Sequence, residues 1–328
     1  ILKLDSKGEV EWQKTFGGWD DDGANSIQQT ADGGYIVAGW TGSLYDSDVY
    51  ILKLNSEGEV EWQKTFGGKG EDEANSVQQT TDGGYIVAGY SSGDVYILKL
   101  NSKGEVEWQK TFGGKYDDDE ANSIQQTADG GYIVAGWTYN PGSGRSDVYI
   151  LKLNAKGEVE WQKTFGGKDF DVANSIQQTT DGGYIVAGWT KSSDSGEHDV
   201  YILKLNAKGE VEWQKTFGGK SYDEANSVQQ TMDGGFIIAG LTKSIGFGAE
   251  DMYILKLNSK GDLEWQKTFG GEINDEANSI QQTKDGGYIV AGWTESFGSG
   301  NYKDAYLLKL NSKGEIDTTP PEVQIISP

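Results

Sequence analysis

The chain repeats itself about every fifty residues, and this repeat constrains the fold more than any single residue does. The phrase E-W-Q-K-T-F-G-G occurs six times, and its copies end at Gly18, Gly68, Gly114, Gly167, Gly219 and Gly271. Each copy is followed by A-N-S-[IV]-Q-Q-T, by D-G-G-[YF]-I-[VI]-A-G and by an apolar run such as D-V-Y-I-L-K-L-N. A unit of this size cannot bury its own apolar faces, so it must stack against its copies.

Each unit contains four strand-like segments, which we name A, B, C and D in chain order. In the second copy they cover residues 74–80, 85–90, 95–100 and 106–112. The D-G-G between A and B and the N-[SA]-[KE]-G between C and D are turn signals that predict hairpins. Four antiparallel strands in each of six units predict an all-β fold, a six-bladed β-propeller over residues 1–316.

The phrase V-Y-I-L-K-L-N-S-K-G-E-V-E-W-Q-K-T-F-G-G resembles the strand–turn–strand signature of pyrroloquinoline-quinone-type propeller repeats. With D-G-G-Y-I-V-A-G, the unit resembles more closely the propeller repeats of prokaryotic secreted and surface proteins. The resemblance implies the fold and a location outside the cell or on its surface. The metal ligands and catalytic aspartate that the quinone enzymes add outside their repeats have no counterpart in this sequence.

The strand count leaves the closure of the ring open, because there are seven C segments for six blades. We expect the N-terminal D strand, residues 9–16, to complete the last blade beside residues 306–310, which would remove the open edges. A rival arrangement closes the ring with both N-terminal strands and leaves the last C segment outside. The natural protein could also carry more repeats upstream.

The tail T-T-P-P-E-V-Q-I-I-S-P departs from the repeat. Its T-T-P-P reads as an extended linker. The phrase after it resembles the first strand of an immunoglobulin-like domain, so we expect residues 317–328 to be a linker and the start of such a domain.

Composition narrows the classes of function. The net charge is −23, which makes nucleic acid and anionic lipid unfavourable partners. There is no cysteine, which excludes disulfides, thiolate metal sites and cysteine nucleophiles. No apolar run is long enough to cross a membrane as a helix.

Variation between the copies is concentrated in two loops. The B–C loop has three residues at 91–93 and ten at 294–303, and the D–A loop changes its sequence in every copy. Antiparallel strands place these two loops on one face of the disc and the constant A–B and C–D turns on the other. Variable loops on a rigid scaffold are the usual place for binding.

A recurring set of aspartates and aromatic residues lies on that loop face. The first aspartate of each unit precedes strand A, and the second opens strand C. The first aspartates are Asp22, Asp72, Asp119, Asp171, Asp223 and Asp275, and the second are Asp48, Asp94, Asp147, Asp199, Asp251 and Asp304. The end of strand B carries Trp40, Tyr90, Trp137, Trp189, Leu241 or Trp293.

These residues have two interpretations. As ligand-binding groups, Trp40, Tyr90, Trp137, Trp189 and Trp293 would form shallow pockets with Asp48, Asp94, Asp147, Asp199 and Asp304. Aromatic faces beside carboxylates suit sugars. In the structural interpretation the aromatic residue fills the gap between blades and each aspartate accepts backbone N–H groups in its turn.

Calcium is a further hypothesis, with no other cofactor expected. The hard oxygen ligands gather at Asp20, Asp21 and Asp22 and at Asp117, Asp118 and Asp119, without the alternation of a dedicated calcium loop.

Three functions remain. The favoured one is a non-enzymatic binding or adhesion module of a secreted or cell-surface protein, which contacts a glycan or a protein through the variable loops. The alternative is a structural disc that assembles with copies of itself. A hydrolase or lyase at the channel mouth is disfavoured, because catalysis normally needs unlike residues from different blades.

Overall fold

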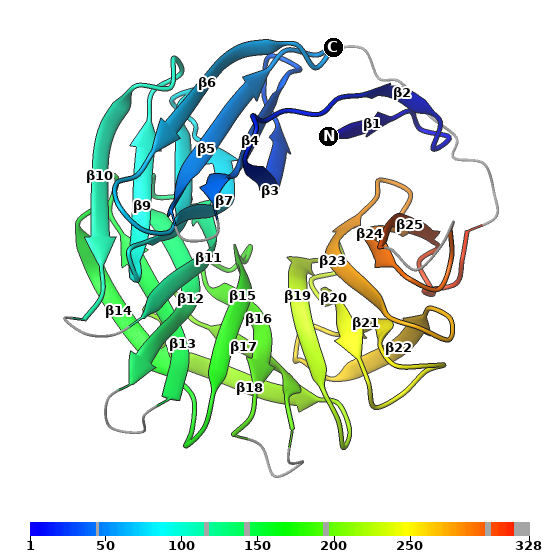
Figure 1. Cartoon of the computed structure of the whole chain (residues 1–328). Coiled ribbons are helices and arrows are strands. Elements are labelled where there is room, and N and C mark those ends of the chain that lie inside the picture. Colours follow the sequence, from blue (N-terminus) through cyan, green and yellow to red (C-terminus); the bar gives the residue numbers. More distant parts are fainter. Residues whose placement is uncertain (44–45, 115–117, 141–144, 193–196, 299–302, 318–328) are drawn as a thin grey trace.

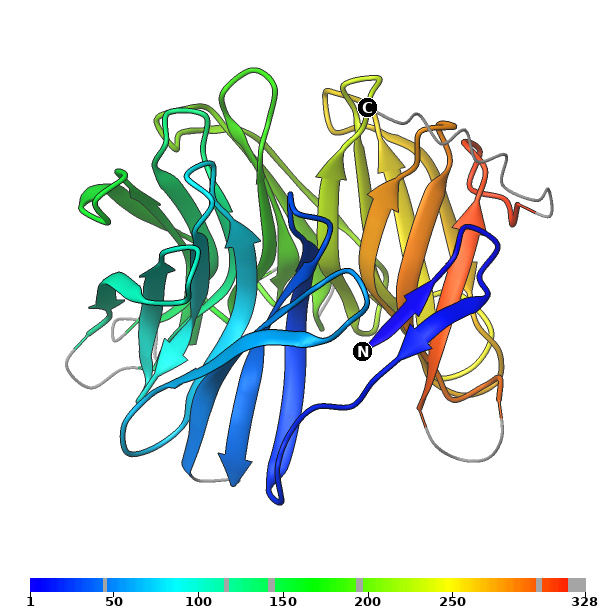
Figure 2. The ribbon, with the colours of Figure 1, turned by 90° about the horizontal axis from the view of Figure 1, so that it is seen from above.

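The computed structural model describes residues 1–43, 46–114, 118–140, 145–192, 197–298 and 303–317, and this part of the chain is built from strands without a helix. Figure 1 shows the blades around a central axis, and Figure 2 shows the disc from its side. Across the described residues there is no helix that could span a membrane. The predicted all-β, six-bladed β-propeller is confirmed.

Five blades have four antiparallel strands each, in the order A, B, C, D from the axis outward. Blade 1 comprises β3 (Asp21–Gln29), β4 (Tyr35–Ser43), β5 (Asp46–Leu54) and β6 (Val60–Phe66). Blade 2 comprises β7 (Asp72–Gln79), β8 (Tyr85–Ser91), β9 (Asp94–Leu100) and β10 (Val106–Phe112). Blade 3 comprises β11 (Asp119–Gln126), β12 (Tyr132–Asn140), β13 (Arg145–Leu153) and β14 (Val159–Phe165).

The second half of the ring continues the pattern. Blade 4 comprises β15 (Asp171–Gln178), β16 (Tyr184–Thr190), β17 (Asp199–Leu205) and β18 (Val211–Phe217). Blade 5 comprises β19 (Asp223–Gln230), β20 (Phe236–Thr242), β21 (Asp251–Leu257) and β22 (Leu263–Phe269). Blade 6 has three strands, β23 (Asp275–Gln282), β24 (Tyr288–Thr294) and β25 (Asp304–Leu310), and β1 (Leu2–Leu4) and β2 (Val10–Gln13) form a separate hairpin.

The core lies between the blades rather than within them. Ile51 of blade 1 joins Tyr85 and Leu98 of blade 2 in one buried cluster, and equivalent clusters follow around the ring. Trp62, on the outer strand of blade 1, meets Tyr85 edge to face at 5.7 Å. Burying one such large side chain contributes about 1.5–3 kcal/mol, so stacking of the repeats stabilises the fold.

A buried lysine of strand C joins the A–B turn to strand D at the turn face of each complete blade. Lys53 is almost fully buried, and its Nζ lies 2.9 Å from Asp32 and 2.8 Å from Glu61 while donating to the carbonyl of Leu54. Because these lysines alternate with apolar residues on strand C, the sequence predicts that each pairs with an acid, and this is confirmed.

The A strands are joined around the axis by side-chain amides. Gln28 Oε1 accepts the N–H of Gln79 in the next blade at 2.6 Å, and Asn75 donates to the carbonyl of Ala121 at 3.1 Å. The sequence predicts that Q-Q-T of strand A faces the central channel or the neighbouring inner strands and pairs there, and the pairing between inner strands is confirmed.

The predicted closure of the ring is wrong. β2 pairs with β1 and not with β25, and the hairpin is joined to no other sheet. Its Trp12 meets Tyr35 edge to face at 5.7 Å, so the hairpin stands where strands C and D of a preceding blade would stand. A short turn joins β1 to β2, so this pairing costs less chain entropy than closing the whole ring. The rival arrangement is also not observed, because β25 pairs with β24.

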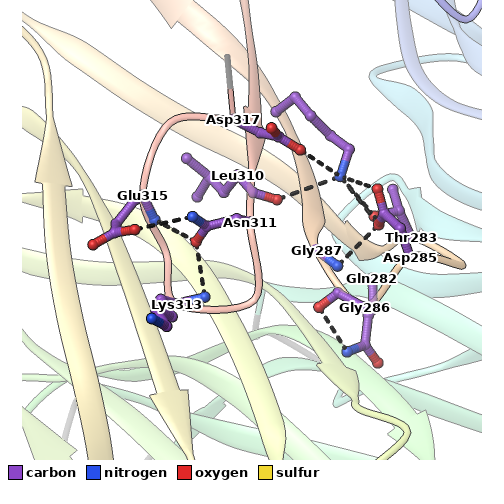
Figure 3. Close-up of polar contacts among 11 residues, drawn as sticks. Gln282, Thr283, Asp285, Gly286, Gly287, Leu310, Asn311, Lys313, Glu315 and Asp317 are labelled. Carbon is purple, nitrogen blue, oxygen red and sulfur yellow. Dashed lines mark hydrogen bonds and ion pairs between the residues drawn. The ribbon is translucent and has the colours of Figure 1, made fainter. Parts of the chain in front are cut away.

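A short segment of the chain begins the missing fourth strand of blade 6. Ile316 forms a bridge with Leu310, and the N–H of Asp317 donates to the carbonyl of Lys309. Asp317 thus takes the position of the strand D glutamate, and its carboxylate lies 3.8 Å from the lysine Nζ (Figure 3). The predicted linker and domain start beyond Asp317 lie outside the described residues.

This arrangement leaves a seam between blade 6 and blade 1. Leu307 on β25 is 47% exposed, whereas Ile254, its equivalent in blade 5, is fully buried. Ile27 on β3 is 52% exposed, whereas its equivalent Val77 is 5% exposed. Two apolar faces that other blades bury therefore lie open at the seam.

Candidate functional site

The two variable loops meet on one face of the disc, as predicted. The N–H of Ser92 in a B–C loop donates to the carbonyl of Glu71 in a D–A loop, and Lys191 donates in the same way to Phe170. The loops support each other, so their side chains are held by backbone hydrogen bonds as well as by the blades.

The first aspartate of each unit holds the F-G-G turn. Asp72 is fully buried, and its Oδ2 accepts the N–H of Gly68 at 2.7 Å. The same bond recurs in the other five units. This is the turn role of the structural interpretation.

The second aspartate of one unit lies beside the first aspartate of the next unit. A Cβ added to Gly67 would lie 2.1 Å from Asp48 Oδ1 and 2.6 Å from Asp72 Oδ2, so only glycine fits between the carboxylates. Burial raises the pKa of Asp48, and the charge of Asp72 adds to this. The candidates Asp94, Asp147 and Asp199 have the same placement, while Asp304 adjoins Gly298.

The aromatic residue at the end of strand B points to the other face of the sheet from these aspartates. In blade 3, Asp119 is the register partner of Thr138, whereas Trp137 faces Glu120. Successive side chains of a strand point to opposite faces, so the acid across from each aromatic residue in its own blade is this glutamate. Glu73 and Glu276 have the same relation to Tyr90 and Trp293.

The sequence interpretation missed these glutamates. They follow the first aspartate in D-E-A-N-S, and counting residues from the A–B turn on both strands would have paired them with the aromatic position. The copies without glutamate have Gly23 and Val172 there.

Two cavities open on the loop face at these residues. The first, about 460 Å³, lies between blades 2 and 3 and includes Tyr90, Trp137, Asp119, Glu120 and Glu71 in its lining. The second, about 530 Å³, lies between blades 3 and 4. Its lining includes Trp137, Trp189, Phe170, Glu120, Asn122 and Asn174.

The structure thus brings three predicted aromatic residues, Tyr90, Trp137 and Trp189, to the cavities. Trp40 and Trp293 are half-buried and occupy the equivalent positions at the end of strand B in blades 1 and 6. The lining of these two cavities contains none of the candidates Asp48, Asp94, Asp147, Asp199 and Asp304.

The polar groups of the first cavity are partly desolvated. Burial raises the pKa of the Glu120 carboxyl, against the opposing effect of hydrogen bonds from Asn75 and Trp137. Burial also raises the pKa of the Tyr90 hydroxyl, which is further raised by the charge of Glu73 and by its hydrogen bond to that carboxylate.

The calcium candidates do not assemble into a cluster. Within the described ranges, no group of three or more His, Asp or Glu side chains is placed to hold a metal ion. Asp22 and Asp119 hold their glycine turns, Asp21 is the first residue of β3, and Asp20 and Asp118 belong to the D–A loops. Asp117 lies outside the described residues.

His198 is the one histidine of the sequence and its place in the polar loop S-S-D-S-G-E-H predicts a solvated side chain, but the structure shows it packed. Its ring stacks on Trp189 with centroids 3.9 Å apart, and its Nδ1 lies 2.9 Å from Glu224 Oε1. Tyr222 covers it edge to face at 4.6 Å.

The chain is similar to known protein sequences over part of its length. Residues 127–160 and 283–319 match the family described as a domain of unknown function (DUF5122) beta-propeller. The regulatory protein FlaEY of Caulobacter vibrioides is 25% identical over 181 residues, which cover 48% of this chain and 19% of that protein. The chain therefore spans about a fifth of that relative's length.

Solved structures share the fold at low sequence identity. Sqt1 from Chaetomium thermophilum has a TM-score of 0.52 at 13% identity, over 91% of this chain and 74% of that one. The Pan2 WD40 domain of Neurospora crassa has a TM-score of 0.50 at 11% identity, over 87% of this chain and 88% of that one. A luciferin-regenerating enzyme has the same score and identity, over 92% and 95% of the two chains. These similarities show the propeller fold.

Proposed function

We propose that this chain is a non-enzymatic binding module whose ligand occupies the loop-face cavities at Tyr90, Trp137 and Trp189. The observation that carries the proposal is the pair of aromatic-lined cavities, which open among loops that vary from copy to copy on a scaffold that does not. Large aromatic side chains at a surface cavity offer apolar area to a ligand at low cost in conformational entropy.

The lining chemistry supports binding rather than catalysis. The described lining of the two cavities contains aromatic, acidic, amide and small residues and no histidine or lysine. General acid–base or nucleophilic catalysis needs unlike groups positioned around a reacting atom, and near-identical blades repeat one arrangement instead.

One solved structure of similar fold holds a segment of another protein. The structure of Sqt1 bound to the N-terminus of the ribosomal protein L10 has a TM-score of 0.50 to this chain at 12% identity. Our proposal includes a protein or glycan partner outside the cell or on its surface, because the repeat resembles those of surface proteins.

Selection of ligands with a matched pair of variants tests the proposal. Peptide display and a glycan array are screened with the wild-type chain and with a Tyr90→Ala, Trp137→Ala double variant. Met232→Ala is the control, because Met232 is 71% exposed and lies on the A–B turn, on the opposite face. We expect selected ligands to lose binding to the cavity variant and to keep it with the control. Equal binding to all three proteins, or no ligand from either screen, would refute a binding role for this face.

The alternative, a structural disc, is supported by the seam. The exposed Leu307 face of blade 6 and the surplus strand β1 could join neighbouring copies. Sedimentation velocity from 1 to about 100 μM distinguishes the two roles, a typical range for weak association. Self-association that Leu307→Glu abolishes would favour the disc, and a monomer throughout would remove it.

A further inference from the structure

The chain places its own cations over aromatic rings at several points of the loop face. Lys303 Nζ lies 3.5 Å from the centre of the Trp293 ring, and Lys243 Nζ lies 5.2 Å from that of Tyr222. Arg145 lies 4.8 Å over Phe170. Besides these cations, the imidazole ring of His198 covers Trp189 beside Glu224.

The contact at Trp293 shows what this position of the blade accommodates. Glu276 is the register partner of Trp293, so an aromatic face and a carboxylate border the same space. Burial raises the pKa of Glu276, and the positive charge of Lys303 opposes that effect. A cation over an aromatic face is attracted to the electron-rich ring, and the attraction is stronger where water is excluded.

The cavity between blades 2 and 3 also has aromatic rings beside carboxylates, but its described lining contains no cation. Tyr90 and Trp137 supply the aromatic faces, and Glu71, Asp119 and Glu120 supply carboxylates. A cation there would meet negative charge from more than one side, in a chain whose net charge is already −23.

The wall of this cavity contains a buried carboxylate oxygen without a donor. Asp119 is 2% exposed and lines the cavity, and its Oδ1, like those of the equivalent Asp22 and Asp72, has no hydrogen-bond partner among the described residues. In blades 4, 5 and 6 a threonine hydroxyl donates to the equivalent oxygen. These pairs are Thr190 with Asp171, Thr242 with Asp223 and Thr294 with Asp275.

A buried carboxylate oxygen without a donor loses its hydrogen bonds to water and gains none in return, which is unfavourable. The cost is removed when a donor enters the cavity. A lysine ammonium has three N–H donors and an arginine guanidinium has five, and each can also cover an aromatic face.

We infer that the cavity between blades 2 and 3 binds a cationic side chain, lysine or arginine, carried on a segment of a protein partner. Trp137 and Tyr90 pack against the aliphatic stem and the cation, and Glu120 and Asp119 accept its hydrogen bonds. The inference rests on the proposed binding function and adds the class of ligand. We use the word cage for the aromatic ring at the end of strand B together with the acid beside it. In the cage at Trp293 the ring is covered by Lys303 of the chain itself, and His198 covers Trp189 beside Glu224, outside the lining of the second cavity.

Single-charge peptides test the inference without the general attraction of a polycation. The probes are blocked Gly-Ser-Lys-Ser-Gly and Gly-Ser-Arg-Ser-Gly peptides, with Gly-Ser-Gln-Ser-Gly as the neutral match, at about 0.15 M salt, where surface charges are screened beyond about 8 Å. The readout is the indole N–H resonance of Trp137 in ¹⁵N-labelled protein, assigned with Trp137→Phe.

We expect the Lys and Arg peptides to shift the Trp137 resonance saturably and the Gln peptide to leave it unchanged. Glu120→Gln should weaken the binding at least about fivefold, since a charge-assisted hydrogen bond is replaced by a neutral one. A matching shift with the Gln peptide, or full affinity in Glu120→Gln, would overturn the inference.

Opening a closed cage is the second arm of the experiment. Lys303→Ala removes the cation from Trp293, so the Trp293 resonance should respond to the Lys peptide in this variant and not in the wild-type chain. No response at Trp293 would contradict the reading of Lys303 as an internal ligand.

The outcomes separate this inference from the proposed function. If the screens select neutral glycans whose binding needs Tyr90 and Trp137, the binding role of the face stands and the cationic ligand class fails. If neither the screens nor the charged peptides detect binding, both fail.

Discussion

Because the seam between blades 6 and 1 is exposed, we expect alanine substitutions of two neighbouring leucines to lower the free energy of unfolding by different amounts. On β25, Leu307 faces the seam and is 47% exposed, whereas Leu308 is 5% exposed and belongs to the cluster between blades 5 and 6. Leu308→Ala should destabilise the protein by about 2–5 kcal/mol, since it removes buried apolar surface and leaves a cavity. Leu307→Ala should cost about 1 kcal/mol, because roughly half of its surface is already in water.

Blade 5 provides the reference pair for this comparison. Ile254 and Leu255 occupy the equivalent positions on β21, and both are fully buried. Ile254→Ala and Leu255→Ala should therefore each cost about 2–5 kcal/mol. Urea unfolding followed by circular dichroism gives the four free energies. If Leu307→Ala costs as much as Leu308→Ala and Ile254→Ala, the seam is covered in solution and the reasoning from its exposure is refuted.

Three further predictions concern the repeated polar contacts. Lys204→Met should lower the free energy of unfolding by about 1–2 kcal/mol, measured in urea at about pH 7. This is a small decrease for a buried lysine, because its partners Asp181 and Glu212 are half-exposed and stay hydrated without it. Gly67→Ala should cost about 1–3 kcal/mol because its Cβ would overlap two carboxylates, whereas Gly68→Ala, with open space around its Cβ, should be close to neutral. The free energy of unfolding should fall as the pH drops from about 4 to about 2. Hydrogen bonds and the buried lysines lower the pKa of the turn aspartates from 3.8 to about 2 in the folded state. Between these pH values the unfolded state therefore binds protons that the folded state does not, which favours unfolding. Circular dichroism of an acid titration checks this, and an unchanged signal down to pH 2 would contradict it. These aspartates are Asp32, Asp82, Asp129, Asp181, Asp233 and Asp285.

The repeat was enough to predict the blades, because turn residues and apolar alternation act over a few residues. The same local logic predicted that the strand C lysine pairs with an acid, since Lys53 and Glu61 lie on adjacent strands joined by a tight turn. Ring closure was not predictable in this way. β1 and β25 have nearly the same sequence, so both suit β2, and chain connectivity rather than side-chain pattern decides between them.

The cavity chemistry was missed for a different reason. The sequence placed Trp137 between two aspartates, but a shift of one residue along a strand moves a side chain to the other face. The register with β11 puts Glu120 opposite Trp137, and the aspartate that reaches the first cavity, Asp119, meets there the Tyr90 of the preceding blade. The sequence motif of a single repeat cannot reveal a site that is formed by residues of two neighbouring blades.

The six copies also explain how one scaffold can present different ligand sites. The residues that hold the scaffold, such as Asp223 at its glycine turn and Lys256 at its ion pairs, recur in every copy. The residues that close a cage come from the B–C loop, where His198 and Lys303 lie in loops of different length and sequence. Lys303 is exposed and covers Trp293, so a cage can be opened by this one loop substitution at little cost to stability. Lys303→Ala should therefore change which cages accept a ligand while leaving the free energy of unfolding within about 1 kcal/mol of the wild-type value. His198→Ala should uncover Trp189 at a larger cost of about 1–3 kcal/mol, because it also removes the contacts with Glu224 and Tyr222.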